Sequence, residues 1–364
     1  MTDRFLPGLD LSRRFYAEAV RPLLRLHLPD SAHSAARLGG GSEVLGLDTP
    51  RSADHEWGPR LEVFLEPGAA REHGTRLTRV LADELPKRFL GHPTHFASFP
   101  DEPDTGVMAD TDGPVSHRVT VTSVGAWFHG QLGFDPLDGV TTLDWLATPT
   151  QRLAEQTAGA VFHDGLGRLA GARRRLAWYP DDVWRYALAA QWQRIAQEEA
   201  FVGRTGEVGD EAGSAVVAAR LVRDLMRLAF LLERVWAPYS KWLGSAFARL
   251  VLAGTLGRPL RDALAARSWK ARERALSAAY ETAADAQNRL GLCEPVDPSV
   301  RRFFGRPFLV LDAGRLAAAL RRGIGDPALR ARPLVGAVDQ FVDSTDVLSH
   351  PARFRAAARA VHEA

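Results

Sequence analysis

The sequence is poor in cysteine and has no long apolar run. Cys293 is its only cysteine, so the chain can form neither an internal disulfide nor a cysteine-based zinc cluster. No stretch of about 18 uncharged apolar residues is present, which is the length that a membrane-spanning helix requires. The N-terminus also lacks the basic segment and the apolar core of a secretory signal peptide. These absences predict a cytoplasmic protein with no membrane partner.

The chain also lacks a strong excess of either charge. It carries 46 lysines and arginines against 44 aspartates and glutamates, a formal net charge of +2. So weak a field does not favour an anionic membrane, and it argues against nucleic acid as a partner. The composition, 46% hydrophobic and 25% charged over 364 residues, is that of a globular chain long enough for two domains.

The first predicted domain, residues 1–150, mixes helix and strand patterns. An amphipathic helix is expected at 11–28, with one apolar face formed by Leu11, Phe15, Ala19, Leu23 and Leu26. Short β-type runs predict strands at 61–65 and 117–124. Further helices are expected at 72–85, 127–136 and 143–158, and a loop at 93–114.

The second predicted domain, residues 151–364, is dominated by helix patterns. Long helical periods with capping residues cover 181–201, 210–236, 240–256 and 268–292. The stretch 161–176 is compatible with a hairpin or a helix, and 308–311 with a strand before a helix at 312–322. The predicted fold class is therefore α+β, a small mixed sheet with helices followed by a large α-helical domain.

A glycine turn and an acidic pair precede the first predicted strand. The stretch at residues 39–65 reads GGGSEVLGLDTPRSADHEWGPRLEVFL. Eleven residues separate Gly41-Ser42 from Asp54, and Glu56 lies two residues after Asp54. Backbone N–H groups of such a turn can bind phosphate oxygens. Carboxylates at i and i+2 of an extended chain lie on one side, so both can bind one Mg²⁺. The pattern predicts metal-assisted nucleotidyl transfer.

These residues resemble the motif of the DNA polymerase β-like nucleotidyltransferase superfamily, in which Gly-Ser, a spacer and two acids one residue apart follow each other. The chain as a whole is similar to the DUF4037 family, through GSEVLGLD, DHEWGPRLEVFL, QWQRIAQEEAFVGR, GDEAGS, ARLVRDLMRLAFLLER, APYSKWLGSAFARL and DQFVDSTDVL. The resemblance implies a nucleotidyltransferase-like domain at 1–150 and a helical domain that completes its cleft. It also implies Mg²⁺-dependent transfer of a nucleoside monophosphate from a triphosphate such as ATP, with one or two Mg²⁺ ions. The acceptor hydroxyl or amine is not identified, and a small molecule is favoured.

Under this resemblance, Asp54 and Glu56 are the catalytic metal ligands, and Gly41 and Ser42 contact the phosphates. Arg60 either binds a phosphate or covers Trp57 on the surface. Each assignment has an ordinary alternative. The two acids are also typical of a loop before a strand, and the Gly-Ser pair of a plain turn or a helix N-cap.

The helical half supplies further candidates under the same resemblance. Glu198 or Glu199 would act as general base for the acceptor, the alternative being a solvated junction with capping acids. Tyr239 and Lys241, at a helix start after a proline, form a candidate anion site in which the lysine would bind the triphosphate. The alternative is a surface lysine beside a capping serine. The segment 339–348 holds three aspartates and is assigned no role.

One departure from the superfamily pattern separates two functional hypotheses. A third carboxylate is expected on the later strand, where this chain has Thr120, a residue that cannot replace a carboxylate on a metal. Glu62 is a possible substitute for the third carboxylate, but the sequence does not show toward which side of the strand its side chain points. The departure favours a second hypothesis, a degenerate nucleotidyltransferase that binds or senses a nucleotide without turnover. A toxin–antitoxin component is a weaker idea because of the large helical half. Oligomeric state and preferred nucleobase are not given by the sequence.

Overall fold

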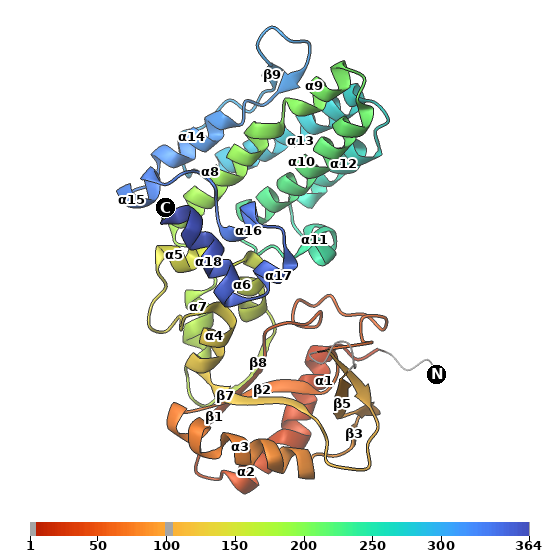
Figure 1. Cartoon of the computed structure of the whole chain (residues 1–364), viewed down its shortest axis with the longest axis vertical. Coiled ribbons are helices and arrows are strands. Elements are labelled where there is room, and N and C mark those ends of the chain that lie inside the picture. Colours follow the sequence, from red (N-terminus) through yellow and green to blue (C-terminus); the bar gives the residue numbers. More distant parts are fainter. Residues whose placement is uncertain (1–4, 99–104, 364) are drawn as a thin grey trace. The chain divides into compact units, whose positions relative to one another are not determined.

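The computed structural model describes residues 5–98 and 105–363, and it divides into two compact units (Figure 1). The first unit contains the chain up to residue 140 together with 152–177, and the second contains 141–151 together with 178–364. The sequence analysis placed a single boundary at residue 150. In the structure the chain passes between the units three times near that point, because a short helical segment packs with the second unit before the last strand of the first.

A small mixed sheet forms the centre of the first unit. Its strands, in the order β7-β2-β1-β8, are β7 (Arg118–Ser123), β2 (Arg60–Leu65), β1 (His33–Arg37) and β8 (Ala160–Asp164). β1 runs antiparallel to both of its neighbours, whereas β2 and β7 are parallel. The two strands predicted from the sequence are confirmed. The undecided stretch 161–176 contains β8 followed by helix α7 (Leu169–Arg175).

β2 is buried along its whole length, which explains its apolar sequence. Leu61, Val63 and Leu65 belong to the core cluster of the first unit, which also includes Leu11 and Leu81. Because side chains alternate along a strand, Arg60 and Glu62 lie on the opposite side of β2. The strand therefore places a charged pair, separated by one residue, on the side away from this core.

The N-terminal helical run differs from its prediction on one face. It consists of α1 (Gly8–Phe15), the π-helical turn η1 (Tyr16–Val20) and α2 (Arg21–His27). The core face is formed by Leu11, Phe15, Val20, Leu24 and Leu28, whereas Leu26 is 69% exposed. Ala19 and Leu23 are partly buried against this core, so the predicted face was wrong at Leu26 and missed Val20 and Leu24. The π-turn adds a residue to the helical repeat, which shifts the later core positions by one.

The remaining elements of the first unit surround the sheet. They are α3 (Pro67–Glu84), α4 (Val124–Leu132), most of α6 (Thr150–Thr157), and two small hairpins, β3 (Arg88–Phe89) with β4 (His92–Pro93) and β5 (His95–Ser98) with β6 (Gly106–Ala109). The prediction of an unstructured loop at 93–114 was wrong for the hairpin strands. Strands of four residues within a Pro- and Gly-rich stretch give too short an alternation to read from the sequence.

The second unit is built from helices. They are α5 (Thr142–Ala147), α8 (Asp181–Glu198), α9 (Phe201–Glu207), α10 (Glu211–Leu232), α11 (Ser240–Phe247), α12 (Ala253–Ala265), α13 (Trp269–Arg289), α14 (Gly314–Arg322), α15 (Pro327–Ala331), α16 (Val338–Phe341), α17 (Thr345–Leu348) and α18 (Pro351–His362). A short hairpin, β9 (Arg301–Arg302) with β10 (Leu309–Val310), precedes α14. The long helices were predicted, but the stretch 240–256 is divided between α11 and the start of α12. In the described ranges no helix has both the length and the apolarity needed to cross a membrane.

Close helix packing in this unit depends on a glycine. Gly206 of α9 faces the indole of Trp269 at the start of α13, and a Cβ at position 206 would lie 2.1 Å from its Cγ. Only a residue without a side chain permits this approach. The glycine-rich stretch 203–209 is therefore mostly helix, packed against a tryptophan, and not a nucleotide-binding loop.

Candidate functional site

The glycine turn follows β1 directly. In the described part of the chain, no hydrogen bond engages the backbone N–H groups of Gly40, Gly41 or Ser42. Gly40 is exposed and the next two residues are half-buried. Gly41 has φ of +151°, and a Cβ there would lie 2.5 Å from Nη2 of Arg60, so the position requires glycine. The residues after Ser42 form a turn and not a helix, so this serine caps no helix.

A buried arginine–glutamate network lies beside the glycine turn. Arg37 donates from Nε to Glu43 Oε1 at 2.8 Å and from Nη1 to Glu62 Oε1 at 3.0 Å. Arg60 donates from Nη2 to the same Glu43 oxygen at 2.9 Å, and Glu62 Oε2 accepts from the Leu38 N–H at 2.8 Å. Burial works against charge on Arg37, but the two glutamates outweigh it and raise its pKa. Arg37, Arg60, Glu43 and Glu62 are all buried, and their two positive and two negative charges balance.

The direction of Glu62, left open by the sequence, follows from this network. Glu62 is 5% exposed, and its carboxylate accepts from Arg37 and from the backbone N–H of Leu38. The carboxylate is therefore unavailable as a replacement metal ligand. Burial raises the pKa of Glu62. Thr120 lies opposite Glu62 in the parallel register of β2 and β7 and is exposed.

Glu56 is held by arginines. Its Oε2 accepts from Nη1 of Arg60 at 2.8 Å, and its Oε1 accepts from the Gly106 N–H at 2.6 Å and from Nη2 of Arg118 at 3.3 Å. The backbone of Glu56 has φ of +44°, a left-handed conformation that is rare for a residue other than glycine. Through these hydrogen bonds Glu56 connects Arg60 of β2, Arg118 of β7 and Gly106 of the hairpin strand β6.

Asp54 and Glu56 are not arranged as the sequence analysis assumed. They lie in a series of turns, so the extended chain that would place both carboxylates on one side is absent, and that premise was wrong. The Asp54 carboxylate, 64% exposed, accepts from the N–H of His55 at 3.0 Å and approaches its Nδ1 at 2.8 Å. Within the described ranges no three His, Cys, Asp or Glu side chains converge as a metal site. With Glu56 paired to cations, these residues do not fit a Mg²⁺ site.

Trp57 is a core residue, so Arg60 does not cover it on the surface. It is 2% exposed, and its Nε1 donates to Asp48 Oδ2 at 3.0 Å. The same Asp48 oxygen accepts from the N–H of Gly8 at 2.7 Å, which fixes the start of α1. Sequence reasoning missed Asp48 and Arg118. Only the alternation of Arg60 and Glu62 along a strand signalled that charges would gather at this side of the sheet.

The two glutamates proposed as a general base are both engaged. Glu198 accepts two hydrogen bonds from Arg220, at 2.9 and 2.6 Å. Glu199 is 6% exposed, and its carboxylate accepts from the backbone N–H groups just before α14, those of Leu311, Asp312 and Ala313. Glu199 therefore fixes the chain entering α14, and burial removes it from contact with an acceptor substrate.

The burial of Glu199 predicts a pH-dependent stability. Burial is the main cause that raises its pKa to about 7, against 4.5 for an ordinary glutamate, although three N–H donors oppose the shift. Between these values the folded chain keeps a proton that the unfolded chain loses. The stabilisation is complete below pH 4.5 and is lost as the pH rises through about 7. Glu199→Gln should flatten this decline in Tm, and an unchanged slope would contradict the assignment.

Tyr239 and Lys241 lie at the start of α11 on the surface of the second unit. Tyr239 is 40% exposed, and its N–H donates to Oε1 of Gln151 at 2.9 Å. Lys241 is exposed, with its Nζ 5.2 Å from the ring centre of Trp242. The N-cap of α11 is Tyr239, whose side chain makes no capping hydrogen bond, so Ser240 is not the cap. The surface interpretation of this lysine accounts for these contacts.

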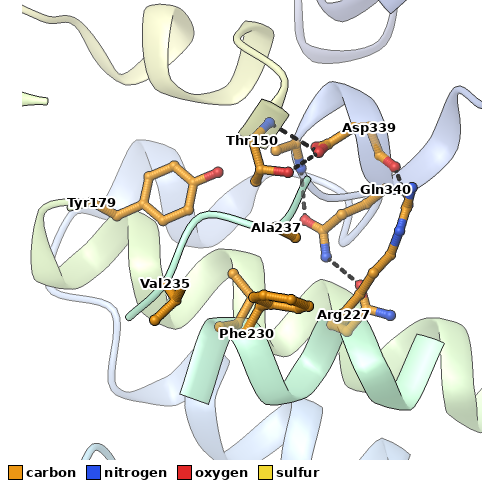
Figure 2. Close-up of a pocket in the computed structure, with 11 residues that line it drawn as sticks. Thr150, Tyr179, Arg227, Phe230, Val235, Ala237, Asp339 and Gln340 are labelled. Carbon is orange, nitrogen blue, oxygen red and sulfur yellow. Dashed lines mark hydrogen bonds between the residues drawn. The ribbon is translucent and has the colours of Figure 1, made fainter. Parts of the chain in front are cut away.

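A pocket in the second unit was not predicted (Figure 2). Its walls come from the start of α6, the segment before α8, α8, α10, the segment after α10 and the start of α16. They consist of Thr150, Tyr179, Gln191, Arg227, Phe230, Leu231, Val235, Ala237, Ala337, Asp339 and Gln340. Its polar side is formed by Asp339 and Thr150, and its other side is mainly apolar. It includes the first aspartate of the segment 339–348, to which the sequence analysis gave no role.

The chain combines a small mixed α/β unit with a larger helical unit. Residues 145–243 match the model of DUF4037, a domain of unknown function, which supports the resemblance noted from the sequence. The match extends from within α5 to the first half of α11 and includes most of the pocket walls. No curated protein matches the chain.

Proposed function

We propose that the first unit is a degenerate nucleotidyltransferase-like module that binds the phosphate chain of a nucleoside triphosphate without turning it over. The observation that carries this proposal is the succession of N–H groups at Gly40, Gly41 and Ser42, which have no partner within the described chain. Successive N–H groups form concave anion sites, and glycine lets a phosphate approach the backbone closely. Arg60 supports the turn by donating to the Gly40 carbonyl at 3.0 Å.

Arg118 is the cation best suited to contact the phosphates. Its side chain is 35% exposed, and its hydrogen bond to Glu56 is long at 3.3 Å. Its guanidinium also lies 5.7 Å from the ring centre of Phe96, which holds it near the surface. A phosphate can replace Glu56 as its partner, since guanidinium groups bind phosphate oxygens through two parallel hydrogen bonds.

The acidic side chains favour binding over transfer. Transfer by metal-bound carboxylates requires that the acids converge, whereas Glu56 is paired with two arginines and Asp54 with His55. Thr120 adds no carboxylate, and Glu62 is committed to the buried network. The Mg²⁺-dependent transfer expected from the resemblance therefore becomes the alternative outcome of the experiment below.

Calorimetric titration with ATP, GTP, CTP and UTP, with and without Mg²⁺, tests this proposal. We expect saturable binding that does not require Mg²⁺ and that weakens roughly tenfold to a hundredfold in Arg118→Gln, since a hydrogen bond to a charged group contributes about 1.5–3 kcal/mol. Arg88→Gln is the matched control. Arg88 forms an exposed pair with Asp110 at 2.8 Å in the same unit, and its loss should leave nucleotide affinity unchanged.

Release of labelled pyrophosphate is measured on the same proteins. None is expected from the wild type. Pyrophosphate release that disappears in the double variant Asp54→Asn/Glu56→Gln would replace our proposal with metal-dependent transfer. Failure of all four nucleotides to bind would overturn both the sensor and the transferase hypotheses.

A further inference from the structure

The hairpin of β9 and β10 carries an exposed phenylalanine at its turn. Phe304 is 84% exposed and has φ of +53°, a left-handed backbone conformation that is rare for a residue other than glycine. The hairpin is fixed beneath it, because the rings of Phe303 and Phe308 stack with their centres 5.7 Å apart. Phe308 is fully buried against Gly203 of α9, where a Cβ at position 203 would lie 2.6 Å from the Phe308 Cβ. The fold therefore presents Phe304 to solvent on a well-packed support.

Helix α9 adds exposed apolar side chains beside this hairpin. Phe201 begins the helix and Val208 follows its last residue, and the two are 40% and 80% exposed. Residues seven apart share one face of a helix, and Arg204 lies between them on that face, with its guanidinium 5.6 Å from the ring centre of Phe201. The hairpin turn lies next to this face, because Nη1 of Arg306 is 3.7 Å from Oε2 of Glu207. Both elements lie at the same end of the second unit (Figure 1).

This end of the second unit is basic. The segments 201–208 and 301–310 together contain four arginines and a single acid, Glu207. Arg204 and Arg302 are exposed, and neither forms an ion pair with a residue that the structure describes. The sequence analysis expected no membrane partner because the net charge of the whole chain is only +2, but that sum does not describe this local surface. We call the exposed set the aromatic–basic patch, which consists of Phe201, Arg204, Val208, Arg302, Phe304 and Arg306.

We propose that the aromatic–basic patch binds the surface of an anionic phospholipid bilayer. Phe304 and Val208 enter the boundary between headgroups and acyl chains, and the arginines contact the lipid phosphates. Guanidinium groups suit this role because they are weakly hydrated and bind phosphate oxygens through paired donors. Separate apolar side chains, each beside an arginine, fit a fluid surface that closes around them, whereas a folded protein partner requires a continuous complementary face. The patch lies wholly in the second unit, so the proposal does not depend on nucleotide binding by the first.

Co-sedimentation of the full chain with lipid vesicles tests this proposal. We expect binding to vesicles that contain phosphatidylserine and phosphatidylcholine, and much weaker binding to vesicles of phosphatidylcholine alone. Raising the ionic strength from about 0.1 M to about 1 M should weaken the binding, because the Debye length falls from about 10 Å to about 3 Å. A single-stranded oligonucleotide is tested in parallel. Equal binding to both kinds of vesicle, or failure to bind the mixed vesicles whether or not the oligonucleotide binds, would overturn the proposal.

Substitutions at exposed positions place the contact in the patch. Phe304→Ser should weaken binding to the mixed vesicles about tenfold, the lower end of the range for burying an aromatic side chain. Arg302→Gln should weaken it about fivefold, the usual contribution of one cation near an anionic bilayer. Val251→Ser is the matched control, because Val251 is 86% exposed and its N–H donates to Glu233, at the end of α10 remote from α9. Its vesicle binding should equal that of the wild type. Equal losses in Phe304→Ser and Val251→Ser would contradict the assignment of the patch.

Discussion

Replacement of Arg37 with methionine should lower the free energy of unfolding of the first unit by about 3–5 kcal/mol, the usual cost of removing one partner of a buried ion pair. Arg37 is 3% exposed and holds both Glu43 and Glu62. Without it, the Glu62 carboxylate remains buried with no cationic partner of its own. The Arg37 guanidinium also donates to the backbone carbonyls of Leu38 and Gly40, so its loss should loosen the glycine turn as well.

Hydrogen exchange of β1 and β2 measures this effect for the first unit alone, since a chain of two units is not expected to unfold in one step. The double variant Arg37→Met/Glu62→Met removes the stranded carboxylate and should recover part of the loss. Arg14→Met is the control, because Arg14 pairs with Glu18 on the exposed side of the N-terminal helical run. Equal protection of β1 in Arg37→Met and in Arg14→Met would refute the importance of the network.

Replacement of Phe354 with alanine should destabilise the second unit by about 3–5 kcal/mol, the range for truncating a buried phenylalanine. Phe354 of α18 is fully buried in a small cluster with Ala147, Val338 and Ala358. Val338 immediately precedes Asp339 of the pocket. The cavity left by the ring should therefore weaken the packing of α16 as well as that of α18.

Phe304→Ala is the matched control for this prediction, because Phe304 is 84% exposed in the same unit. Its truncation should change the free energy of unfolding by less than about 0.5 kcal/mol, as is usual for surface positions. Amide exchange of α18 and α16 distinguishes the two variants. If the two truncations cost the same, the C-terminal helix is not anchored by Phe354 in solution.

The candidate site was predictable from the sequence in its glycines and arginine. Gly41 and Ser42 stand at an accessible turn, and Arg60 lies beside it, buried and bonded to Glu43 and Glu56. The two acids were predicted to act together, but Asp54 contacts His55, whereas Glu56 contacts Arg60 and Arg118. Arg118 lies 62 residues from Glu56 in the chain, a separation over which no sequence spacing indicates contact.

The fold was predictable where a periodic pattern is long or strongly apolar. β2 and the helices α8, α10 and α13 follow from such patterns. The hairpin of β5 and β6 and the π-turn η1 did not follow, because short strands and a single added residue leave no periodic trace.

The sequence by itself determined the composition of the two parts of the chain and the order of the long helices and of β2 and β7, because hydrophobic periodicity is local. It also determined that a glycine turn and two acids precede the strand β2. Only the tertiary structure decided what each acid does. Glu62, Glu199 and Asp339 take partners 24, 112 and 189 residues away, and the protonation and availability of a carboxylate depend on those partners and on its burial.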